Sequence, residues 1–313
     1  MITITVKIGA QNAWQYIIED ARESPPTGVR FRIPGIISGG TPMGHDFNTK
    51  QIRGLSAPGA TDQRSIANVQ TSKHNYNWSV TYVPCKRISA PKYHFLHFFG
   101  CAMNNTSSTA DAGAWTFGTT LTTALRFMTL FKEVDNMQHQ LAGALIGRIS
   151  VKGALDAPIE ITADGPASLS TFADLARTDA TTLRDATPFM WSDIAVYIDA
   201  ALATFVTAFE FNLNNSAENI WALGDKNPQQ AVPVARIVDV TLTRQYQDIA
   251  QYADARANTA KSITIRFTDT SGDTVDFRFR GCKLQGHPLP EAPPEEGVLV
   301  HELKYDVATF GAE

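Results

Sequence analysis

Residues 274–284 read Thr-Val-Asp-Phe-Arg-Phe-Arg-Gly-Cys-Lys-Leu, and this stretch decides the fold class. Its middle alternates aromatic and charged side chains, so the phenylalanines fall on one face of a strand and the charges on the other. Residues 270–273, Thr-Ser-Gly-Asp, form a tight turn directly before it, and residues 262–269 form a second β-rich run. The pattern predicts an antiparallel hairpin.

Similar runs recur along the 313 residues, separated by glycine, proline and asparagine. They are short and rich in threonine and β-branched residues, which is typical of antiparallel β proteins. We therefore expect a mainly β fold. The other predicted strands are Asn77–Val83, Gln140–Val151, Pro158–Ala163, Ile194–Ile198, Phe205–Asn212, Ala235–Arg244 and Val298–Ala308.

Two segments predict helices, and their positions suggest an internal repeat. Pro91–Met103 and Asp248–Ala257 each follow a strand and precede further strands. In each half, a strand then carries a glycine followed by a small residue, at Gly143 and at Gly281. Glycine inside a strand indicates a bulge or a close backbone approach. The alternative is one large sandwich, in which any two β runs look alike.

This repeat sets the expected division of the chain. Residues 1–170 form a β domain with a long glycine-rich arm, residues 171–187 form a linker, and residues 188–313 form a second β-sandwich domain. Pro34–Asn68 and Asn212–Pro233 are long and rich in glycine, proline and asparagine. Loops of this size inside a domain are usually functional.

Composition narrows the range of functions. The net charge is −4, which offers no basic field to hold nucleic acid by neutralising phosphates. The three cysteines are far apart and predict neither a disulfide framework nor a zinc site. No apolar run reaches 18 residues, and the N-terminus lacks the pattern of a signal peptide, so no membrane association is expected.

No catalytic signature stands out. His94 and His97 are spaced to share a metal but lie among phenylalanines, which favours packed histidines. The glycine-rich run at 35–44 lacks the lysine of a phosphate-binding loop. We expect a structural protein and not an enzyme, with no cofactor.

The most specific part of the chain lies at 188–243. It reads Pro-Phe-Met-Trp-Ser-Asp-Ile-Ala-Val-Tyr-Ile at 188–198 and Phe-Val-Thr-Ala-Phe-Glu-Phe-Asn-Leu-Asn-Asn at 205–215. Trp-Ala-Leu-Gly-Asp-Lys-Asn-Pro follows at 221–228. These segments resemble the tail tube (major tail) proteins of long-tailed, siphovirus-like phages and viruses of prokaryotes. The resemblance covers 188–309 and is only architectural over the first half, which has a longer arm and an insertion at Asn104–Thr123.

The resemblance implies a fold and a set of partners. We expect two tail-tube-like β-sandwich domains, each with one short flanking helix, joined into a ring-forming barrel. The partners are further copies of the chain, with three two-domain chains giving a pseudo-sixfold ring, or else six chains per ring. Stacked rings would enclose a tape measure protein and DNA. The protein would be made in the host cytoplasm and reside in the virion tail.

The same resemblance suggests the contact residues between subunits and rings. They are Asn212, Asn214, Trp221, Leu223, Asn227 and Pro228 in one loop region, and Phe47 and Leu55 in the first-half arm. Trp221 folded back on its own core is the competing interpretation. For the whole protein, the alternatives are a tail completion or terminator protein, a distal ring or decoration protein, and a carbohydrate-binding β-sandwich.

Overall fold

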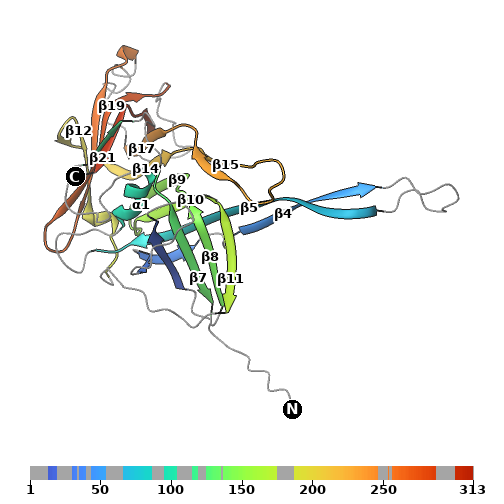
Figure 1. The fold of residues 1–313 in the computed structure, drawn as a ribbon. Coiled ribbons are helices and arrows are strands. Elements are labelled where there is room, and N and C mark those ends of the chain that lie inside the picture. The colour runs from blue at the N-terminus through green and yellow to red at the C-terminus, as the bar shows by residue number, and fades with distance from the viewer. Residues whose placement is uncertain are drawn as a thin grey trace, which may run out of the picture.

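Antiparallel strands dominate the structure, a computed structural model, as the alternating sequence predicts (Figure 1). The residues described are 13–19, 30–33, 35–39, 44–53, 66–86, 95–103, 115–118, 125–134, 137–174, 187–245, 253, 256–286 and 300–312.

The elements of the first half are β1 (Ala13–Ile18), β2 (Phe31–Arg32), β3 (Gly35–Gly39), β4 (Gly44–Arg53), β5 (Ile66–Pro84), α1 (Leu96–Ala102), β6 (Trp115–Gly118), β7 (Met128–Val134), β8 (Met137–Ala144), β9 (Arg148–Ala154), β10 (Glu160–Ala167) and β11 (Leu169–Asp174). Those of the second half are η1 (Trp191–Asp193), β12 (Ile194–Ile198), β13 (Ala201–Leu202), β14 (Val206–Asn214), β15 (Ala217–Ile220), β16 (Gln230–Pro233), β17 (Ile237–Gln245), β18 (Lys261–Thr268), β19 (Thr274–Leu284), β20 (Val300–Asp306) and β21 (Thr309–Ala312).

A central sheet runs through both halves of the chain. Its strand order is β3-β5-β10-β9-β14-β17-β20-β19, and every neighbouring pair is antiparallel. The first four strands come from the first half and the last four from the second. β9 and β14 join the two groups, with seven paired residues from Ala154↔Ala208 to Arg148↔Asn214.

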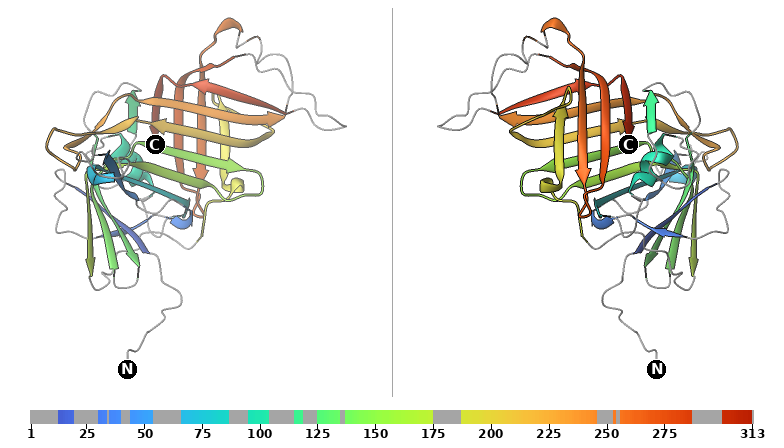
Figure 2. Two further views of the ribbon diagram at one scale, coloured as in Figure 1. Left: turned by 90° about the vertical axis from the view of Figure 1, so that its right-hand side faces the viewer. Right: turned by 90° about the vertical axis from the view of Figure 1, so that its left-hand side faces the viewer.

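Two further sheets cover one face of the central sheet. One has the order β11-β8-β7-β1-β2, and the other has the order β13-β12-β18-β19-β21, with β6 beyond β21. β19 belongs to two layers, because its first part pairs with β18 and its last two residues pair with β20. Figure 2 shows β18 and β19 running across the strands of the central sheet, as in orthogonally packed sheets.

The two glycines chosen from the sequence occupy equivalent bulges. Two residues, 142 and 143, lie opposite Thr129 in the β7–β8 pair, and 280 and 281 lie opposite Ser262 in the β18–β19 pair. Both glycines have positive φ, 61° at Gly143 and 66° at Gly281. This is the conformation in which glycine avoids the strain of a Cβ atom.

The equivalence extends beyond the bulges. Ser168 N–H donates to the Ala142 carbonyl at 3.1 Å, and Ala308 N–H donates to the Arg280 carbonyl at 3.2 Å. In each case the acceptor directly precedes the bulge glycine. Leu169 and Thr309 next pair with these same two acceptor residues. The two halves therefore share one strand order and one register.

Helix α1 packs between the halves and joins their cores. Phe98 contacts Tyr16 and Tyr82 of the first half, with ring centroids 5.2 and 5.8 Å away. Phe99 contacts Phe277 and Phe310 of the second half, at 5.2 and 6.4 Å. Because all seven helical residues are buried, α1 acts as a core element. One continuous apolar cluster results.

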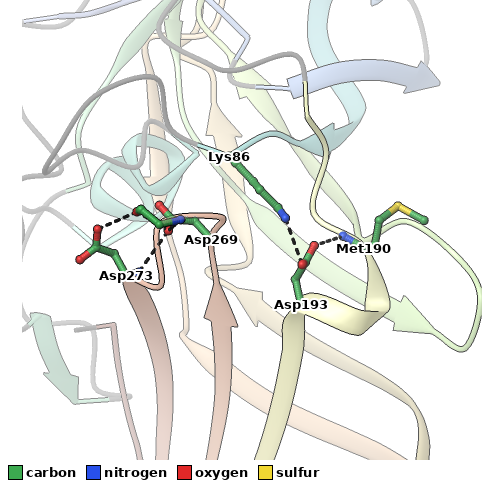
Figure 3. A network of polar contacts seen from close by, with 6 residues as sticks. Lys86, Met190, Asp193, Asp269 and Asp273 are labelled. Carbon is green, nitrogen blue, oxygen red and sulfur yellow. Dashed lines mark hydrogen bonds and ion pairs between the residues drawn. The ribbon is translucent and has the colours of Figure 1, made fainter.

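Lys86 and Asp193 form a partly buried link between the halves (Figure 3). Lys86, directly after the Cys85 bridge that follows β5, places Nζ 3.0 Å from Asp193 Oδ1 in η1. The other carboxylate oxygen accepts the Met190 N–H at 2.9 Å. The same figure shows the β18–β19 turn, where Asp269 Oδ1 accepts the N–H groups of Ser271 and Asp273 at 2.8 and 3.1 Å. These bonds close the hairpin that the sequence predicts.

One expected strand is wrong, and two expected helices are described only in part. The prediction of one strand over Gln140–Val151 is wrong, because the Gly143 bulge ends β8 at Ala144 and a three-residue connection precedes β9. Helix α1 covers the later part of Pro91–Met103, whose first four residues are not described. Of the predicted helix at Asp248–Ala257, only residues 253, 256 and 257 are described, and they are helical.

The structure also describes parts of the expected linker and of the expected insertion. Residues 171–174 of the expected linker lie in β11, and residues 175–186 fall outside the described part. From the insertion at Asn104–Thr123, β6 reaches the second half and pairs with β21, from Trp115↔Ala312 to Gly118↔Thr309.

Candidate assembly surfaces

One face of the central sheet is polar across the seven strands from β5 to β19. The opposite face carries buried side chains such as Val80, Ile161, Val151, Phe211 and Leu242. On the polar face, strand register aligns charged residues from both halves. The acids are Glu160, Asp164, Glu210, Asp239, Glu302 and Asp306, and the bases are Arg148, Lys152, Lys283 and Lys304. Carboxylates therefore outnumber bases on this face.

Asn212 lies at the centre of a polar network on this face. Its Nδ2 donates to Asp239 Oδ1 at 3.1 Å and to Glu210 Oε1 at 3.3 Å. Its Oδ1 accepts from Arg148 Nη2 at 2.9 Å, across the junction between the halves. Lys152 and Glu210 form an ion pair across the same junction at 3.2 Å. The side chain of Asn212 is thus used within the chain and does not lie in the following loop.

The central sheet ends in two edges without a further described strand. At one end, β3 pairs with β5 only. At the other, Lys283 and Leu284 of β19 pair with β20 only. Exposed backbone edges of this kind are templates for pairing with another chain. The described part of the protein therefore presents two unpaired edges of one sheet.

A long arm and a shorter loop project from the same end of the central sheet (Figure 1). The arm is the β4–β5 hairpin, which pairs Gly44↔Asn77 to Arg53↔Ile66. The loop carries the β15–β16 hairpin. β3 leads into the arm, and β14 leads into the loop. Because β3 and β14 are equivalent strands of the two halves, the arm and the loop are equivalent insertions.

The loop packs against the arm around His74. Trp221 Nε1–H donates to the His74 carbonyl at 3.1 Å, and His74 N–H donates to the Lys226 carbonyl at 2.8 Å. The Tyr76 hydroxyl donates to Asn227 Oδ1 at 2.7 Å. His74 Nδ1 lies 3.1 Å from the same Asn227 oxygen. Lys73 Nζ lies 4.1 Å from the centre of the Trp221 ring, within the range of a cation–π contact.

The structure brings some of the predicted contact residues together. Trp221 and Asn227 meet at His74, and Phe47 of β4 pairs with His74 in register. Leu223 is fully exposed, whereas Pro228 is buried. Asn214 accepts the Ser216 N–H at 2.8 Å and shapes the start of the loop. Leu55 lies outside the described residues.

His74 and Tyr76 are the contact residues that sequence reasoning missed. Each occupies a place in the long strand β5, where alternation predicts only strand structure. Their role depends on a loop about 150 positions away along the chain, at Asn227. The equivalence of the arm and the loop was the signal that could have indicated this contact. Two equivalent insertions become neighbours when the two halves join side by side.

Two cysteine thiols and the His97 ring lie in the protein interior. Burial raises the pKa of the Cys101 and Cys282 thiols to about 12, which leaves both as unreactive thiols at neutral pH. His97 is packed as expected, with Nδ1 2.8 Å from the Tyr16 hydroxyl. Within the described ranges, no three His, Cys, Asp or Glu residues come close enough to hold a metal ion. No described helix has the length and apolar character to cross a membrane.

The chain matches a known protein family. The sequence profile of a family described as "Phage tail tube protein" matches residues 49–300. The match begins in β4 and ends at the start of β20, so it covers parts of both halves and the β9–β14 junction. No individual curated protein matches the chain.

Proposed function

The chain belongs to the phage tail tube protein family and is a structural component of the virion tail, and we propose that it forms the stacked rings through which viral DNA passes. The observation that carries this proposal is the β9–β14 junction. There, two equivalent four-stranded groups already join edge to edge within one chain.

The junction suggests how one chain would join the next. β14 in the second half is equivalent to β3 in the first, since each pairs with the strand before the helical segment and carries a register shift opposite the end of that strand. The connection from Leu145 into β9 corresponds to the end of β19. Gly147 N–H and Gln285 N–H both donate at 2.8 Å, to the carbonyls of Asp164 and Lys304, which are equivalent. Repeating the junction would place the chain that continues from the end of β19 beside β3 of the next chain.

We propose a ring of three chains. Each chain supplies two four-stranded groups, so three chains give six groups and a pseudo-sixfold barrel. A closed barrel also removes the two unpaired sheet edges, which would otherwise favour aggregation. Six chains per ring would be needed if only one half lined the lumen.

Native mass spectrometry of the purified protein tests this stoichiometry. We expect a particle with the mass of three 34.2-kDa chains and no ring of six. A six-chain ring would overturn the three-chain arrangement and leave the family assignment in place.

The polar face of the central sheet is the proposed wall of the lumen. It holds six carboxylates against four bases, and Lys152 and Glu210 pair with each other across the sheet. A surface with excess carboxylate does not gain affinity from releasing the counterions of DNA. DNA, and the tape measure protein before it, would therefore pass along this wall without being held.

The loop between β15 and β16 is the proposed ring-stacking element, with the arm beside it. Deletion of Ala222–Gln229 is expected to stop polymerisation, but it also removes Asn227 and its contact with Tyr76. Leu223→Asp is the cleaner variant, because this side chain is fully exposed and its removal leaves the arm contacts in place.

Negative-stain microscopy separates the tube from the other ring-forming tail proteins. A tube protein assembles into long tubes of constant diameter. Tail completion, terminator and distal proteins stop at a single ring, and a decoration protein or carbohydrate-binding β-sandwich forms no ring by itself. Single rings from the unmodified protein under all assembly conditions would therefore contradict the tube function.

A further inference from the structure

An apolar groove lies at the end of the central sheet opposite the loop. Its volume is about 300 Å³, and Leu155, Trp191 and Leu202 are among the residues that line it. Their exposed fractions are 51%, 40% and 60%. Phe205, next to the groove residue Val206, is 59% exposed. Single exposed apolar residues are common, but a rimmed group of four marks an interaction surface.

The chain holds this groove in place with unusual backbone geometry. Phe205 has φ of 62°, a conformation that is strained for a bulky residue. Its carbonyl accepts the Gln245 N–H at 3.0 Å. Asp199 and Ala200 also have positive φ and form the two-residue turn before Leu202, as in a type I′ hairpin. The apolar side chains are thus presented by fixed turns.

The loop at the other end of the central sheet carries an apolar side chain at its tip. Leu223 projects from the loop with its side chain fully exposed, and Gly224 beside it has φ of 94°. β14 begins at the groove, at Val206, and ends at the loop, at Asn214. Eight steps along a strand correspond to about 26 Å. Figures 1 and 2 show β15 and β12 on opposite sides of the molecule.

Charge complements the apolar match. Asp156, exposed and adjacent to Leu155, sits at the groove. Lys226, exposed and three positions from Leu223, sits on the loop. Asp156 has no ion pair with any described residue, and the same holds for Lys226. An acid at one end and a base at the other favour contact between two copies arranged head to tail.

We propose that the groove at Leu155, Trp191 and Leu202 receives the Leu223 tip of a second copy in the next ring, with Lys226 facing Asp156. This inference rests on the proposed function, because it names the receptor for the stacking loop. A head-to-tail contact between different surfaces does not close on itself, so it repeats into an open stack. The groove and the loop then account for the polarity of the tube.

Mixing two defective variants tests the proposal. Leu223→Asp rings keep an intact groove, and Leu202→Asp rings keep an intact loop. Each variant alone is expected to form single rings, with the circular dichroism and melting temperature of the unmodified protein. Mixed in equal amounts, they are expected to form two-ring particles, since one intact interface remains between the two kinds of ring. Sedimentation velocity and negative-stain microscopy measure the outcome.

Reversing the charges at Lys226 and Asp156 provides a second test, in variants that are expected to stay folded. Lys226→Asp alone is expected to raise the concentration needed for tube growth, and Asp156→Lys in the same chain is expected to restore it. Phe172→Asp is the matched control, because Phe172 is 62% exposed on β11, in a different sheet, and its variant should form normal tubes.

The results distinguish failure of the groove assignment from failure of the proposed tube function. Full tubes from Leu202→Asp would overturn the groove assignment and leave the tube function standing. Single rings in the mixture would also overturn it, as would loss of tubes in the Phe172→Asp control. Failure of the unmodified protein to form either rings or tubes would instead contradict the proposed function.

Discussion

Gly143 and Gly281 lie 138 positions apart and adopt the same conformation at the same point of two hairpins, with φ of 61° and 66°. Each lies in a two-against-one bulge, and a buried small residue follows each, Ala144 and Cys282. At each bulge the chain turns from one sheet toward the next. This relationship underlies the repeated register of the two halves.

Alanine at either glycine is expected to destabilise the fold. A Cβ atom in the left-handed region costs about 1–2 kcal/mol. At Gly281, the new Cβ would also come within 2.8 Å of the Ala308 Cβ. We expect Gly281→Ala to lower the free energy of unfolding more than Gly286→Ala, whose φ is 68° with no atom within 4 Å. Urea denaturation measures the difference, and Ala308→Gly in the Gly281→Ala background should recover part of it.

Gly165→Ala is expected to be more damaging than alanine at either bulge. Gly165 has no positive φ, but a Cβ there would fall on the Leu145 carbonyl and within 2.7 Å of the Gly147 nitrogen. Since both contacts are backbone atoms, the connection into β9 would have to shift. Gly147→Ala is the control, because its Cβ would have ordinary contacts of 3.4–3.6 Å. Equal melting temperatures for the two variants would contradict this view of the β8–β9 connection.

Asp276 is expected to make stability depend on acid pH. Burial raises the pKa of this carboxyl, but the hydrogen bonds and charges of Arg266 and Arg278 outweigh it and leave the pKa below the usual 3.8. Arg266 binds both carboxylate oxygens, at 2.6 and 2.8 Å. Because the pKa is lower in the folded state, the ionised carboxylate stabilises the fold above about pH 4. That stability is lost as the pH falls through the lower folded value.

Asp276→Asn tests this dependence. We expect a loss of about 1.5–3 kcal/mol at pH 7, as for a hydrogen bond to a charged group. The variant should also show a shallower fall in unfolding free energy below pH 4 than the unmodified protein. Asp225→Asn, in the exposed loop, should match the unmodified protein at both pH values. Parallel pH profiles for Asp276→Asn and the unmodified protein would show that the Asp276–Arg266 pair does not cause the loss of stability at acid pH.

Trp221→Phe is expected to release the loop from the arm without unfolding the protein. The phenyl ring can still contact Lys73, but the hydrogen bond to the His74 carbonyl is lost. A net loss of about 1 kcal/mol corresponds to an about fivefold larger population of the open loop. Hydrogen exchange of the β15–β16 amides measures this. Tyr76→Phe, which removes the bond to Asn227 from the arm side, should give the same change, while α1 exchange stays constant.

Local patterns along the sequence determined much of the fold. Alternation at 274–284 predicted β19 with its observed bounds, and 194–198 likewise predicted β12. A strand's side chains alternate whatever it pairs with, so this signal needs no knowledge of the partner. The glycines within strands also predicted the bulges, because a positive φ is a property of a single residue and does not depend on the partner strand. The tail tube resemblance of the sequence agrees with the family match over 49–300.

Only the tertiary structure decided which strands and loops meet. Sequence alone did not show that β9 pairs with β14, that β6 crosses to β21, or that Trp221 and Asn227 rest on His74. Each is a contact between segments far apart in the chain, and the same alternating pattern fits many partners. The groove at Leu202 arises in this way too, because its walls come from separate turns that only folding brings together.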